Sequence, residues 1–135
     1  MSDGLRKNIA RARAMARDGS FDHAAQAYGL AAQLARRFEL AGELAFCLRH
    51  QAQCLFDSDC AQAALAPAQE SLDIYTRIEP DRGPNYAESA RLVARIKDAL
   101  GKSGEAQNLW TELREIYDIH GSETSVEECD IRLTA

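Results

Sequence analysis

A threefold internal repeat constrains this chain more than any other feature of its sequence. Three segments that begin at residues 19, 59 and 101 align without gaps, and their first matched site is always alanine, at Ala24, Ala64 and Ala106. Further matched sites lie four, seven and ten residues on: Tyr28, Ala68 and Trp110, then Ala31, Ser71 and Leu113, then Leu34, Ile74 and Ile116. These offsets trace one face of an α-helix, so the pattern predicts three similar amphipathic helices.

A turn signal precedes each of these helices, and another amphipathic segment precedes each turn. The turns contain Gly19-Ser20, Asp57-Ser58-Asp59 and Gly101-Lys102-Ser103-Gly104, and the preceding helices are expected at about 4–18, 42–57 and 85–100. The unit is therefore helix, turn, helix, three times over. A small residue at the first matched site lets the two helices approach closely, and stacking of adjacent units would bury the core.

Composition agrees with an all-α fold. The chain is 46% hydrophobic and rich in alanine, whereas β-branched residues are scarce, which favours helix over strand. Residues 1–135 fit one domain, with repeats at about 4–38, 42–78 and 85–120. Ser122 and the spacing of Val126, Cys129 and Leu133 predict a capping helix at about 122–133. The predicted fold is an α-solenoid of three hairpins plus this C-terminal capping helix.

Proline marks two places. Pro67 lies inside the second matched helix, where it removes a backbone donor, so we expect a bend near 63–67; the alternative is a helix that begins near Leu65. Pro80 and Pro84 bracket the clearest loop of the sequence, residues 79–84.

Charge and cysteine content restrict location and partners. The net charge of −5 combines +3 over residues 1–55 with −8 over residues 56–135, and an acidic total argues against nucleic-acid or anionic-membrane binding. No segment resembles a signal peptide or a membrane span. Cys47 and Cys54 would lie about 10 Å apart along one helix axis, too far for a disulfide. We therefore expect free thiols and a cytoplasmic location.

At the residues just described, the chain resembles the tetratricopeptide repeat family, in which a small residue is followed four positions later by an aromatic one on the second helix. Ala12, Ala52 and Ala94 also fall where the family keeps a small residue on the first helix. The period of 40–42 residues matches the longer-repeat branch rather than the usual 34. The middle repeat departs from the pattern, with Ala68 in place of the aromatic.

The resemblance implies that the first helices line a concave groove. The residues that matched positions place there are Arg6, Arg13, Arg17, Phe46, Arg49, His50, Gln53, Arg91 and Arg95. Arginine presents a planar, permanently charged fork that suits carboxylates. The carboxylate clamp of chaperone-binding members is not reproduced, because its positions hold Ile9, Arg13, His50, Glu88 and Leu92.

An alternative interpretation is that the arginines pair within the chain, since Glu88 stands three before Arg91 and Asp98 three after Arg95. Cys47, His50 and Cys54 share one helix stripe and could offer three zinc ligands, but small buried thiols explain the spacing more simply. We therefore predict no metal and no cofactor. No sequence motif of a hydrolase, a metalloprotease or a phosphate-binding loop is present.

Together these observations predict a non-enzymatic interaction scaffold. Its groove would bind a peptide or protein segment, with an acidic one as the specific expectation and Arg13, Arg49, Arg91 and Arg95 as the anion contacts. The alternative is a self-associating, homodimeric structural module whose ends or outer ridge pack against a second copy.

Overall fold

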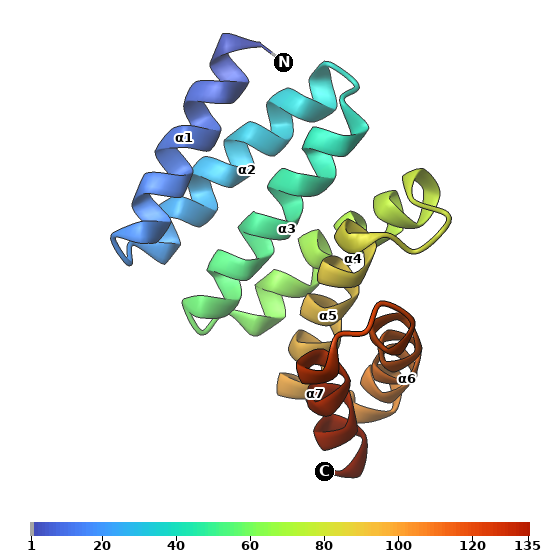
Figure 1. The fold of residues 1–135 in the computed structure, drawn as a ribbon. Helices are drawn as coiled ribbons and strands as arrows, with labels where there is room; N and C mark the ends of the chain where they lie inside the picture. The colour runs from blue at the N-terminus through green and yellow to red at the C-terminus, as the bar shows by residue number, and fades with distance from the viewer. Residues whose placement is uncertain (1) are drawn as a thin grey trace.

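The computed structural model describes residues 2–135 and contains seven α-helices in that range, arranged as a curved stack (Figure 1). Their bounds are α1 Asp3–Arg17, α2 Phe21–Arg37, α3 Ala41–Asp57, α4 Ala61–Ile78, α5 Pro84–Ala99, α6 Ser103–Ile119 and α7 Glu123–Thr134. The described residues include no strand. The fold is thus the predicted all-α solenoid of three hairpins followed by a C-terminal helix. The assignment of the chain to one domain, with the repeat limits given above, stays a prediction.

Five of the six connections end a helix in the same way. In the first, Gly19 adopts a φ of 81°, its N–H donates to the carbonyl of Ala16, and the N–H of Ser20 donates to the carbonyl of Met15. This pair of bonds satisfies carbonyls that the helix end would leave open. The same bonds recur around Glu39, Asp59, Gly101 and Gly121. The turn within each of the three hairpins therefore has the same hydrogen bonds and a positive φ, at Gly19, Asp59 and Gly101.

The connection from α4 to α5 differs, because Glu79 organises it. The Glu79 carboxylate accepts hydrogen bonds from the backbone N–H of Tyr86 and from the side chain of Asn85. Pro84 is the first residue of α5, where its missing N–H is not needed. The loop expected at residues 79–84 therefore ends one residue earlier, as the helix already begins at Pro84.

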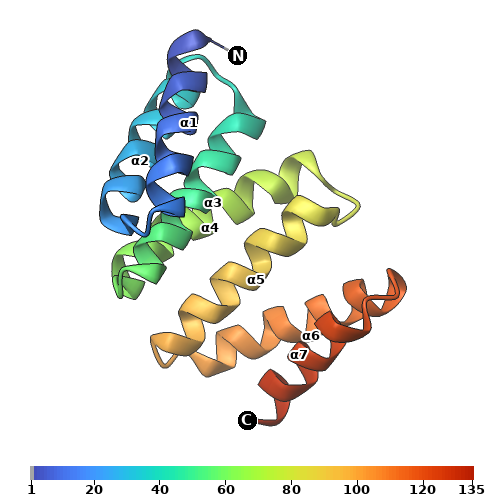
Figure 2. The ribbon, with the colours of Figure 1, turned by 60° about the vertical axis from the view of Figure 1, so that its left-hand side comes forward.

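Contacts run chiefly between helices that are consecutive in the chain, with a smaller contact between α3 and α5. The views in Figures 1 and 2 place α1 and α7 at opposite ends of the stack. This arrangement buries a continuous core in which each hairpin packs on its neighbour.

The matched small residues lie where the repeat predicted them. Ala24, Ala64 and Ala106 are fully buried, and so are Ala12, Ala52 and Ala94 on the first helices. Tyr28, Ala68 and Trp110 are also buried, so the middle repeat uses a small residue where its neighbours use a ring. The repeat register is thus confirmed.

Two local expectations need correction. Helix α4 begins at Ala61 and runs through Pro67, so the alternative start near Leu65 is wrong. Pro67 lies in the second turn, where neighbouring hydrogen bonds and packing of α4 on α3 hold the helix. Ser122 stands at the N-cap of α7, but its hydroxyl donates to Ser125 Oγ rather than capping a backbone N–H.

Candidate binding groove

The first candidate site is a hollow of about 610 Å³ between α1, α3 and the junction of α4 with α5, here called the N-terminal pocket. Its lining residues are Arg6, Ile9, Ala10, Arg13, Gly42, Glu43, Phe46, Tyr75, Ile78, Glu79 and Asn85. Its lining is mixed: Ile9, Phe46 and Ile78 supply apolar surface, and Glu43 and Glu79 supply carboxylates. Ile78 is 46% exposed. Arg6 and Arg13 are exposed at its edge, and no ion pair to either is present within residues 2–135.

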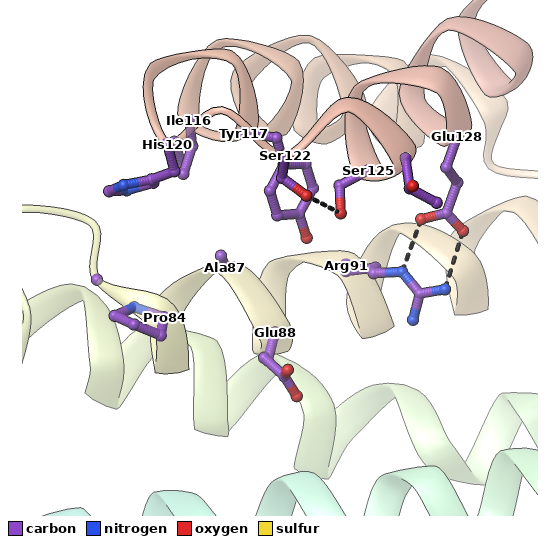
Figure 3. Close-up of a pocket in the computed structure, with 12 residues that line it drawn as sticks. Pro84, Ala87, Glu88, Arg91, Ile116, Tyr117, His120, Ser122, Ser125 and Glu128 are labelled. Carbon is purple, nitrogen blue, oxygen red and sulfur yellow. Dashed lines mark hydrogen bonds and ion pairs between the residues drawn. The ribbon is translucent and has the colours of Figure 1, made fainter.

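A second hollow of about 710 Å³, here called the C-terminal pocket, lies between α5, the end of α6 and the start of α7 (Figure 3). Ala87, Ile116 and Tyr117 contribute apolar surface, and Ser122 and Ser125 contribute hydroxyls. Across this pocket Arg91 donates two hydrogen bonds to Glu128, at 2.7 and 3.0 Å. A bidentate pair of this kind fixes both side chains, so α7 is tied to α5.

The same pairing occurs one repeat earlier. Arg49 of α3 donates to Glu88 of α5 at 3.0 Å, as Arg91 of α5 does to Glu128 of α7. Tyr75 and Tyr117, at matched sites of α4 and α6, lie near Arg49 and Arg91 respectively, and each arginine lowers the pKa of its tyrosine against the larger, raising effect of burial. We call Arg49–Glu88 and Arg91–Glu128, each with its tyrosine, the inter-repeat ion pairs.

The first repeat lacks this arrangement. The sites that match Arg49, Tyr75 and Glu88 hold Ile9, Ala35 and Phe46. Two of these apolar residues, Ile9 and Phe46, line the N-terminal pocket. The N-terminal pocket therefore has apolar side chains at positions where the next two repeats have an arginine paired with a glutamate.

Of the remaining predicted groove residues, Gln53 and Arg95 have partners within the chain. Gln53 donates to Asp57, and the guanidinium of Arg95 lies 5.3 Å from the ring centre of Phe56. Arg17 is exposed at the end of α1 and lines neither of the two pockets. Of the nine predicted residues, the structure brings only Arg6, Arg13 and Phe46 together in the N-terminal pocket, whereas Arg91 lies in the C-terminal one.

His50 is half-buried and packs against two aromatic rings. Its ring stacks on Tyr28 with 5.2 Å between centres, and it lies 4.3 Å from the ring of Phe46. Burial, together with the charges of Arg49 and Arg13, lowers the pKa of His50 to about 4. The imidazole is therefore neutral at physiological pH and serves as an aromatic packing group.

The cysteines of the same helix are also packing groups. Cys47 and Cys54 are buried, and burial raises the pKa of each thiol to about 11. Both are thus protonated at neutral pH, whereas metal ligation needs the thiolate. Within residues 2–135 no cluster of histidine, cysteine and carboxylate has the geometry to hold a metal ion.

Two of the predicted arginines, Arg49 and Arg91, form ion pairs within the chain, but with other acids than helix spacing suggested. Glu88 pairs with Arg49 of the preceding repeat instead of Arg91. Asp98 accepts a hydrogen bond from the Trp110 indole, and its Oδ2 lies 3.6 Å from a guanidinium nitrogen of Arg132. It therefore pairs with Arg132 and not with Arg95. The pairs Glu88–Arg91 and Arg95–Asp98 were expected from their spacing within one helix. In the folded stack, charged side chains of other helices lie closer to Glu88, Arg91 and Asp98 and pair with them instead.

Comparison with solved structures places this arrangement among known folds. A kinesin light chain with TPR-like repeats from Podosopora anserina superposes with a TM-score of 0.82 at 16% identity, over 98% of this chain and 66% of that one. The chain has a tetratricopeptide-like fold. A TPR-like protein of Chlorobium tepidum superposes with a TM-score of 0.76 at 23% identity, and the match includes 97% of this chain and 92% of that one. BtubC from P. vanneervenii superposes with a TM-score of 0.71 at 16% identity, over 99% of this chain and 64% of that one.

The tetratricopeptide-like fold rests on structure rather than on sequence similarity, since no protein-family model and no curated protein matches the chain. The chain spans about two thirds of the length of the kinesin light chain structure. Among residues 2–135, no helix combines the length and apolar character that crossing a bilayer requires.

Sequence reasoning missed four residues that line the two pockets: Glu128, Tyr75, Tyr117 and Ile78. The two tyrosines were visible as matched sites of the repeat, so their recurrence could have flagged them. Glu128 stands 40 residues after Glu88, which is the spacing between Ala24 and Ala64, so its position in the repeat could have indicated it as well.

Proposed function

We propose that this protein is a non-enzymatic interaction scaffold that binds an acidic peptide or protein segment at the α1–α3 end of its concave groove. The N-terminal pocket supports this proposal, because Ile9, Phe46 and Ile78 line it beside Arg6 and Arg13, which form no ion pair in the described chain. Of its two acids, Glu79 is already bound to Asn85 and to the N–H of Tyr86. A ligand carboxylate could bind these guanidinium groups without displacing an internal partner.

The arginines of the inter-repeat ion pairs are poor anion contacts by comparison. A ligand would have to separate Arg49 from Glu88 or Arg91 from Glu128 before it could bind them. The acidic-ligand proposal therefore moves from Arg49, Arg91 and Arg95 to Arg6 and Arg13. The non-enzymatic part of the proposal draws on the neutral His50 and the protonated thiols, which lack the pKa values of a general base or nucleophile. A cytoplasmic location stays a prediction.

The test selects ligands from a random peptide display library and measures their affinity by fluorescence anisotropy. We expect selected peptides to be enriched in Asp and Glu beside a large apolar residue. The double variant R6E/R13E should bind them at least about tenfold more weakly, and I78S should weaken binding through the apolar wall. Circular dichroism establishes that each variant is folded.

Matched controls exist in the same chain. Variant R37E/R77E makes the same change of net charge at exposed residues outside both pockets, and I119S truncates an apolar side chain that is 82% exposed. Both controls should bind like the wild type. Peptides without acidic enrichment, or equal affinity of folded R6E/R13E and wild type, would refute the acidic-ligand proposal.

A further inference from the structure

The two end helices of the stack carry opposite charge. Helix α1 contains five Lys or Arg residues and one acid, whereas α7 contains four acids and one arginine. The two helices lie at opposite ends of the molecule (Figures 1 and 2). In the described chain each packs chiefly on one neighbour, α1 on α2 and α7 on α6, so each leaves an outward face uncovered.

On α1 the outward face is basic. It lies opposite the buried residues Leu5, Ile9 and Ala12 and carries Lys7 and Arg11, both exposed, with small alanines beside them. Neither cation forms an ion pair or a side-chain hydrogen bond within residues 2–135. The face therefore offers two available positive charges one helical turn apart.

On α7 the outward face is acidic and carries one large apolar side chain. Glu123 and Glu127 are exposed, lack ion partners in the described part of the chain, and also stand one turn apart. They line a hollow of about 360 Å³ together with Asp118 and Asp130. Ile131, one turn further on, is 61% exposed.

We infer that α1 of one copy docks on α7 of a second copy, so that molecules join head to tail. Lys7 and Arg11 are about 6 Å apart along their helix axis, as are Glu123 and Glu127, so both charge pairs can form together. The alanines of α1 leave room for Ile131, whose burial adds an apolar contact. This association goes beyond the proposed groove binding and uses different residues.

The second copy is the occupant because this chain itself supplies both complementary surfaces. The split between +3 over residues 1–55 and −8 over residues 56–135 gives one molecule a basic leading end and an acidic trailing end. Contact between two different patches leaves a free patch at each end of a pair, so the assembly is open rather than a closed isologous dimer. Exposed ion pairs are screened by salt, so the assembly is weak and salt-sensitive.

The test measures weight-average mass by sedimentation equilibrium over roughly 10 µM to 1 mM protein in about 20 mM and about 500 mM salt. In low salt we expect the mass of the wild type to rise with concentration and to pass that of a dimer. Variants K7E/R11E and E123K/E127K should each weaken association about tenfold or more. The two variants mixed in equal amounts should recover it, because each then meets a complementary end.

The control R37E/R77E changes net charge as K7E/R11E does and should associate like the wild type. Thermal unfolding of every variant shows that it is folded. A wild type that stays monomeric to the highest concentration, or an oligomer that the reversals do not weaken, would overturn the inference. Failure of the groove proposal leaves this result unaffected, since R6E/R13E leaves Lys7, Arg11 and α7 intact.

Discussion

At single positions, the surrounding side chains decide which protonation state a residue has and which residue fits. His50, Cys47 and Cys54 form a stripe that has the spacing of metal ligands. Burial keeps the two thiols protonated, and partial burial together with the charges of Arg49 and Arg13 keeps the imidazole neutral. At Gly83, the neighbouring Glu79 carboxylate leaves little room for a side chain. A Cβ at this position would lie 2.8 Å from Oε1 of Glu79, the oxygen that accepts from the N–H of Tyr86.

Replacement of Gly83 by alanine should therefore destabilise the protein by about 1 kcal/mol, because the Glu79 carboxylate must move and leave the start of α5 without its cap. Urea denaturation measures the free energy of unfolding. Gly104→Ala is the matched control: nothing lies within 4 Å of its Cβ position, and it stands near the start of a helix. That substitution should be neutral or slightly stabilising, and an equal loss in both variants would contradict the role of Glu79.

His50 should make stability depend on pH. Its pKa is about 4 in the folded protein and about 6.5 when unfolded, so the unfolded chain binds a proton more readily between these values. The stabilisation is complete above pH 6.5 and is lost as the pH falls towards 4. The stability difference between wild type and His50→Gln should therefore shrink by about 2 kcal/mol from pH 7 to pH 4.5.

Chemical denaturation of both proteins across that range measures the effect. Carboxylates titrate in both proteins and cancel in the difference. A constant gap between the two curves would show that His50 does not titrate between folded and unfolded states as described.

At the scale of helices, one buried polar contact joins three of them. Ser71 of α4 donates to the carbonyl of Ala45 in α3 at 2.9 Å, and its Oγ lies 3.0 Å from that of Ser89 in α5. Both serines are essentially inaccessible to solvent. The consecutive hairpins are therefore held by hydrogen bonds as well as by apolar packing.

Ser71→Ala should cost about 1–2 kcal/mol, because it leaves the Ser89 hydroxyl buried without this partner. The double variant S71A/S89A should cost less than the sum of the two single variants, since no orphaned hydroxyl remains. A double-mutant cycle of unfolding free energies measures the coupling. Additive losses would mean that the two hydroxyls do not interact.

In the whole molecule, the stacked arrangement allows one part of the chain to unfold separately from the rest. Because contacts run mainly between consecutive helices, the ends can open without the middle. The two inter-repeat ion pairs differ in burial and in position, one lying inside the stack and the other at its C-terminal end. The Arg49 side chain is 17% exposed and its Nε is buried without a partner, whereas that of Arg91 is 41% exposed and ties down the last helix.

Glu88→Ala should thus cost about 2 kcal/mol, since it removes the acid from a largely buried guanidinium, and should lower amide protection in α3 and α5. Glu128→Ala should cost about 1 kcal/mol or less and lower protection chiefly in α7. Hydrogen exchange with mass spectrometry resolves the two patterns. Loss of protection across α3 in Glu128→Ala would contradict local opening.

The sequence by itself determined the helices, their order and their register. Its repeat of small residues at Ala24, Ala64 and Ala106 is a local periodic signal, and periodicity is set by the geometry of the helix itself. The resemblance drawn from that repeat also predicted the fold that the structural comparisons support.

Only the tertiary structure decided which side chains meet. The pairing of Arg49 with Glu88 and of Arg91 with Glu128 joins residues 39 and 37 positions apart, and such distances follow from how hairpins stack rather than from spacing within a helix. Stacking also left Arg6 and Arg13 without an ion pair in the described chain, beside a hollow that Ile9, Phe46 and Ile78 line. Charge content could be read from the chain, but whether a charge is neutralised depends on neighbours that only the folded stack brings together.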